Sequence, residues 1–145
     1  MRIPRSIHEN MRFLITEVSS QVSHLQTYFE TSSVIVAKRI LDRSGYTYNL
    51  KTSIHRSCLG RIARNKNARS EGALLRSVET IATDLDRISE LCRDCIQQTG
   101  YLNDTGHLPT KLYVSLLERI GRGIRMIDEA INKTDTKLAL KIGRI

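Results

Sequence analysis

The chain has 145 residues, of which 40% are hydrophobic and 26% are charged, and this balance excludes a disordered polymer. Aromatic residues contribute only 5%, with no Trp and two Pro, so helices packed through aliphatic side chains are favoured over a β-sandwich. No apolar run approaches the roughly 20 residues that cross a bilayer, and the length suits one domain with a single core.

The net charge of +8 permits nucleic acid, anionic lipid or an acidic protein as a partner. The densest basic patch comprises Arg61, Arg64, Lys66 and Arg69, and the other basic residues are spread along the chain. A nucleic-acid interface would add aromatic side chains or a recognition module beside such a patch, and the sequence contains neither. The patch is therefore interpreted as a solvated helix end and loop, with nucleic-acid binding as the less favoured alternative.

The first ten residues lack the apolar centre of a signal peptide, and the three cysteines, an odd number, fit reduced thiols. We therefore expect a cytoplasmic protein. Cys92 and Cys95 form a CxxC pair, but a zinc site needs two more soft ligands and Cys58 is the only other cysteine. Both residues are expected to fill the core as small hydrophobic side chains.

Apolar residues at spacings of three and four predict helices over 7–29, 37–62, 74–95, 113–131 and from 138 onward. Hydroxyls at 31–33 offer an N-cap for the second helix, and Gly45 predicts a bend or break within it. Residues 65–70 are expected to form a loop. Gly100 is expected to stop the third helix, and Pro109 suits the first turn of the fourth.

The third helix shows the most regular pattern, with apolar residues in alternating steps of four and three. This pattern predicts a helix packed lengthwise in a bundle. The expected fold is therefore all-α, an antiparallel three-helix bundle followed by the first helices of a second unit. The predicted seam consists of Leu74, Val78, Ile81, Leu85, Ile88, Cys92 and Cys95.

A single offset of 102 residues superimposes the apolar stripe of the first helix on that of the fourth. The same offset carries Val36, Ala37 and Ile40 onto Leu138, Ala139 and Ile142. We expect residues 1–100 to form a first three-helix repeat and residues 107–145 the helical-hairpin start of a second, truncated repeat. The fourth helix must then pack on the first repeat, pair with another chain, or await further residues. A homo-oligomer such as a dimer, or a piece of a longer protein, is expected.

Asp86, Glu90 and Asp94 follow one another at four-residue spacing, so they share one face of the third helix. Relative to the predicted seam this face is the outer one. Carboxylate oxygens on one face suit a cation such as Mg, Mn, Fe or Zn. The same spacing is common on solvated helices, so a plain surface is the alternative.

The segment Asp84-Leu85-Asp86-Arg87-Ile88-Ser89-Glu90 resembles the signature of the PhoU family, in which Arg-Ile-Gly or a similar triplet stands between two acidic residues. Asp86 stands where the family has Glu, Glu90 where it has Asp, and Ser89 replaces a common Gly. The segment 36–43 is similar to the family's Leu-Ala segment leading to an Asp. PhoU proteins are two tandem three-helix bundles, with the signature on the third helix of each.

The resemblance implies a regulator of phosphate-starvation signalling that restrains a phosphate transporter and keeps a sensor kinase quiet. It also implies surface metal clusters held by the signature carboxylates, which makes Asp86, Glu90 and Asp94 the candidate ligands. The second signature helix is absent, so a metal site shared between repeats would be incomplete. The sequence contains no Ser, His and Asp set and no phosphate-cradling Gly loop, so no enzyme is expected. The alternative is a generic helical oligomerisation or interaction module.

Overall fold

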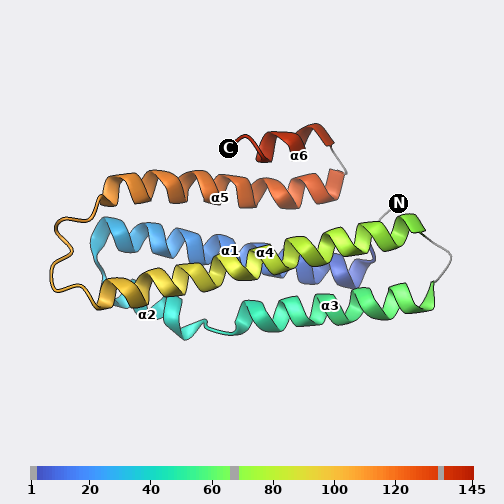
Figure 1. Ribbon diagram of the computed structural model, residues 1–145, viewed down its shortest axis with the longest axis horizontal. Coiled ribbons are helices and arrows are strands. Elements are labelled where there is room, and N and C mark those ends of the chain that lie inside the picture. Colours follow the sequence, from blue (N-terminus) through green and yellow to red (C-terminus); the bar gives the residue numbers. More distant parts are fainter. Residues whose placement is uncertain (1–2, 66–68, 134–135) are drawn as a thin grey trace.

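The computed structural model describes residues 3–65, 69–133 and 136–145, and every regular element in these ranges is an α-helix. This confirms the predicted all-α helical bundle. Figure 1 shows the helices in chain order. They are α1 (Arg5–Thr31), α2 (Val34–Asp42), α3 (Tyr46–Arg64), α4 (Arg69–Gly100), α5 (Thr110–Lys133) and α6 (Thr136–Ile142).

The helix α1 is the centre of the molecule, since it contacts α2, α3, α4 and α5. The pair α2 and α3 runs antiparallel to α1, α4 returns alongside α3, and α5 lies along α1 with α6 folded back over it (Figure 1). Because α1 has neighbours on several sides, its buried residues occupy more than one stripe. They are Ile7, Met11, Leu14, Ile15, Val18, Gln21, Val22 and Leu25.

Two short turns connect α1 to α2 and α2 to α3. They form where the sequence predicts an N-cap and a helix break. Ser32 adopts a left-handed conformation with φ of 54°, and Ser33 caps α2 by accepting a hydrogen bond from the Val36 amide at 3.4 Å. Gly45 has φ of 85°, where a side chain would be strained, and it lies between α2 and α3. The predicted break near Gly45 is therefore confirmed.

The predicted seam of α4 is correct at three positions and displaced at the others. Val78, Leu85 and Cys92 are buried as expected, but the remaining buried apolar positions each lie one residue later than predicted. The helix packs against both α1 and α3, so its buried arc is wider than a single seam, and the large side chains Ile81 and Ile88 lie at its edge, half-buried. The buried residues are Leu75, Val78, Ala82, Leu85, Asp86, Ser89, Cys92 and Ile96.

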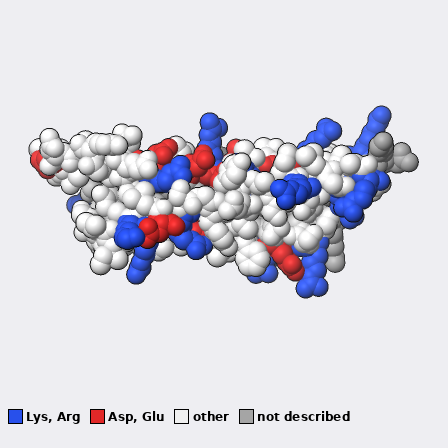
Figure 2. Space-filling view, turned by 90° about the horizontal axis from the view of Figure 1, so that it is seen from below, with Lys and Arg blue, Asp and Glu red and all other residues white. Residues whose placement is uncertain are grey.

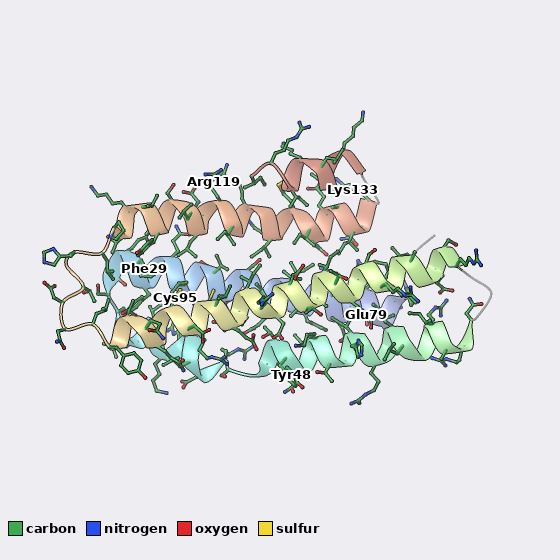
Figure 3. All side chains as sticks on the ribbon, in the orientation of Figure 1. Phe29, Tyr48, Glu79, Cys95, Arg119 and Lys133 are labelled. Atoms are coloured by element: carbon green, nitrogen blue, oxygen red, sulfur yellow. The ribbon has the colours of Figure 1, made fainter. Side chains whose placement is uncertain are left out.

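The fourth predicted helix, α5, packs on α1 within the chain, as one of the three alternatives requires. Gly121 of α5 is buried at this contact, in the neighbourhood of Val22. At the end of α1, Phe29 lies 5.1 Å from Tyr113 between ring centroids (Figure 3). The division of the chain into repeats stays a prediction.

Two adjacent leucines distinguish the observed seam from the predicted one. Leu75 is fully buried and Leu74 only half-buried. We expect Leu75→Ala to lower the free energy of unfolding by about 3 kcal/mol, through lost burial and the cavity it leaves, and Leu74→Ala by about 1 kcal/mol. Urea denaturation of both variants measures this difference. Equal losses would contradict the observed orientation of α4.

Candidate functional site

A polar pocket of about 180 Å³ lies between the start of α3 and the middle of α4. The turn after α2 contributes Ser44 and Gly45, and α4 contributes Asp86, Ser89 and Arg93. The residues of the turn and of α4 meet here because α2 ends before Gly45 and α3 begins after it. The start of α3 then lies beside the part of α4 that resembles the PhoU signature.

Asp86 is buried, with only 2% of its surface exposed. Its Oδ1 accepts a hydrogen bond from Thr47 Oγ1 at 2.8 Å, and its Oδ2 lies 2.6 Å from Lys51 Nζ. The expectation that Asp86 faces outward is therefore wrong. Its side of α4 is covered by α3, and the lysine ammonium supplies the positive charge without which a buried carboxylate is costly.

The other two predicted metal ligands are exposed and are not gathered around one point. Glu90 lines the pocket together with Asp86, whereas Asp94 is not among the residues that line it and lies 4.0 Å from Arg93 Nε. Within the ranges that the structure describes, no three His, Cys, Asp or Glu residues are grouped as a metal site would require. A metal at Asp86 would also have to displace the ammonium of Lys51. The arrangement of these residues does not fit the predicted metal site.

The cysteines differ from their expected placement at one position. Cys58 and Cys92 are buried, but Cys95 is exposed, so the prediction that both members of the CxxC pair fill the core is wrong for Cys95. Desolvation raises the pKa of Cys58 to about 11 and that of Cys92 to about 12, and it also raises the pKa of Cys95. These thiols are protonated at neutral pH, which makes them poor nucleophiles and poor metal ligands.

A second polar contact fixes the turn that forms one wall of the pocket. Arg43, directly after α2, donates to both carboxylate oxygens of Glu17 on α1, at 2.8 Å and 2.6 Å. Its guanidinium also lies 4.3 Å from the centroid of the Tyr46 ring. The hydrogen bonds from Arg43 hold the pKa of Glu17 below its ordinary value.

Some hydrogen-bond donors that line the pocket have no acceptor among the described residues. Arg93 donates to Ser44 Oγ at 2.8 Å, which leaves the Ser44 hydroxyl proton and the other guanidinium N–H groups available. Ser89 is 9% exposed as a whole residue, its hydroxyl is not completely enclosed, and no described group forms a hydrogen bond with it. No side chain caps α3, the Tyr46 amide donates to the Arg43 carbonyl at 3.3 Å, and Thr47 and Tyr48 of the first turn line the pocket.

Sequence reasoning missed Lys51, Thr47, Ser44 and Arg93. Thr47 and Lys51 are one turn apart on α3, and this spacing was the one available signal that they share a face. Nothing in the sequence indicated that this face meets Asp86. Tyr48, which lies beside them on α3 (Figure 3), has its ring centroid 4.6 Å from Lys51 Nζ.

The predicted basic patch is partly neutralised in the described part of the chain. Arg61 forms a hydrogen bond with Glu71, which also accepts one from Asn65 at 2.6 Å, and Lys66 lies outside the described residues. Figure 2 shows positive and negative side chains interspersed along the middle of one face, with Lys and Arg more frequent toward one end. Nucleic-acid binding stays the less favoured alternative, because no recognition module accompanies these residues.

None of the described helices combines the length and the apolar composition needed to cross a bilayer. Comparison with protein-family models, with curated proteins and with solved structures gives no match to this chain. The resemblance to PhoU proteins is therefore supported by the Asp84–Glu90 segment and by the helical bundle.

Replacing Lys51 tests whether its charge is what allows Asp86 to be buried. Lys51→Met keeps most of the side-chain volume but removes the cation, so we expect the free energy of unfolding to fall by about 3 kcal/mol. Lys38→Met is the matched control, because Lys38 forms its 2.7 Å pair with Asp42 at the surface, where such pairs contribute about 1 kcal/mol or less. Urea denaturation compares the two variants, and similar small losses would contradict the role given to Lys51.

The Glu17–Arg43 pair predicts a specific pH dependence. The pKa of Glu17 in the folded state is below the ordinary value of 4.5, so the pair stabilises the fold above that pH and loses this contribution as the pH falls below it. Thermal unfolding of wild type and Glu17→Gln should differ most near neutral pH, and the difference should shrink as the pH falls below 4.5. A difference that does not change over this range would contradict the prediction.

Proposed function

We propose that this chain is a PhoU-like regulatory module that acts in the cytoplasm, without catalysis, by contacting a phosphate transporter or sensor kinase at the membrane. The observation that carries the proposal is the Asp84–Glu90 segment, set on a long helix of an all-helical bundle. The bundle gives this segment a rigid position, which is what a protein that acts through contact requires.

The proposed regulator does not use a metal at Asp86. In the structure the ammonium of Lys51 lies 2.6 Å from the carboxylate, in the place where a bound cation would neutralise it. The module is therefore proposed to keep its shape without a metal, because the charge compensation that connects α3 to α4 comes from the chain itself.

Contact with another protein is supported by an apolar stripe on α5. Leu112, Leu116 and Ile120 follow one another at four-residue spacing, and 56%, 44% and 44% of their surfaces are exposed. Residues at this spacing lie on one face of a helix, and neighbouring exposed apolar side chains mark surfaces that bind a partner.

The same stripe favours one alternative function, an oligomerisation module in which α5 contacts a second copy of the chain. Both functions bury the stripe, but only the regulator changes phosphate transport or kinase state. The double variant Leu116→Lys, Ile120→Lys places charge on the stripe, and Leu59→Lys on α3 is the control, because Leu59 is also exposed but lies on another helix.

The regulator predicts a measurable effect in cells that carry a phosphate transporter and its sensor kinase. Expression of the wild-type chain in ample phosphate should lower the rate of radiolabelled phosphate uptake, or lower kinase phosphorylation, at least about twofold. Leu59→Lys should keep the effect, and the double variant should lose it, since a buried charge without a partner weakens association. Wild-type expression that changes neither quantity would refute the regulatory role.

Light scattering coupled to size exclusion separates the alternative. If the wild type is a dimer that the double variant converts to a monomer, while uptake and kinase state never respond to either protein, the oligomerisation module is the better description.

A further inference from the structure

The pocket between α3 and α4 contains several hydrogen-bond donors that the protein does not use. Ser89 is more than nine-tenths buried, lines the pocket, and has no hydrogen-bond partner among the described residues. Its hydroxyl is not completely enclosed, so it can form a hydrogen bond with water or with a ligand that enters the pocket. The pocket volume of about 180 Å³ is far above the roughly 10–15 Å³ that one water needs, so a small polar ligand fits.

The start of α3 adds backbone donors to the same pocket. Gly45 precedes the helix, no side chain caps it, and Thr47 and Tyr48 line the pocket. The amides of Thr47 and Tyr48 belong to the first turn and have no acceptor within the helix. Such amides, together with the positive end of the helix dipole, favour a bound anion.

The charges around the pocket show which side chain remains to meet that anion. Arg43 is engaged with Glu17, and Asp86 is engaged with Lys51. Arg93 remains, with one guanidinium N–H donated to Ser44 and a distant carboxylate of Asp94 at 4.0 Å. Arginine presents its N–H groups in a planar fork that matches the oxygens of a tetrahedral oxyanion.

Glu90 also lines the pocket, and no ion pair with any described residue neutralises it. A carboxylate repels an oxyanion that carries no proton, such as sulfate. It can instead accept a hydrogen bond from an oxyanion that keeps a proton near neutral pH, as inorganic phosphate and its monoesters do.

We propose that the pocket formed by Ser44, Ser89, Arg93 and the first turn of α3 binds a protonated phosphate group, with Glu90 accepting its proton-bearing oxygen. The site stands on the geometry of the pocket, and only its connection to phosphate signalling rests on the function proposed above. Partner contact and phosphate binding can therefore fail independently of one another.

Isothermal titration calorimetry of the full chain with inorganic phosphate, at constant ionic strength, tests the site. We expect saturable binding of one phosphate, with sulfate at least about tenfold weaker. A small phosphate monoester serves as a further ligand: binding comparable to that of phosphate indicates a phosphate-bearing molecule, and much weaker binding indicates free phosphate as the ligand.

Three variants examine the assigned roles, and circular dichroism checks that each is folded. Arg93→Gln should weaken phosphate binding about tenfold, and Ser89→Ala about threefold. Arg87→Gln is the matched control, because Arg87 is exposed on the same helix and does not line the pocket, and it should bind as wild type does. Glu90→Gln should bring sulfate affinity close to that of phosphate.

Two results would overturn the proposal. One is a titration in which phosphate gives no more heat than a chloride control. The other is an equal effect of Arg93→Gln and Arg87→Gln, which would show general attraction to a basic protein rather than a defined site.

Discussion

The ion pair between Lys51 and Asp86 is the interaction on which the arrangement of the other polar groups depends. It joins α3 to α4 in the interior, and Thr47 completes the carboxylate from the same helix. With Asp86 satisfied in this way, the first turn of α3 is held against the middle of α4. The pocket with Ser44, Ser89 and Arg93 exists because of this placement.

The class of the fold and most helix limits could be predicted from the sequence, because they depend on local chemistry. Apolar spacing located the helices, and the conformational freedom of Gly45 and the hydroxyl of Ser33 located their ends. The packing face of α4 was harder to predict. Ile81 and Ile88 make the predicted seam more hydrophobic than the observed seam, so the sequence alone favours the wrong one of the two. The choice between them depends on which helices pack against α4, and periodicity contains no information about neighbours.

The acidic residues show the same limit at the candidate site. Their four-residue spacing correctly placed Asp86 and Glu90 beside one another, and both line one pocket. Whether a carboxylate faces water or the interior depended on Lys51, which is 35 positions away along the chain. A buried charge is stable only with its partner, so the role of Asp86 could not be read from its own helix.

The exposure of Cys95 has a practical consequence for following the molecule by spectroscopy. The other two thiols are buried, so Cys95 is the one position open to a maleimide or nitroxide reagent without unfolding the bundle. It lies on α4 (Figure 3), less than two turns beyond Ser89, close enough for an attached label to report events at that part of the helix. Because the pKa of this thiol is raised, labelling proceeds faster in mildly alkaline buffer than at neutral pH.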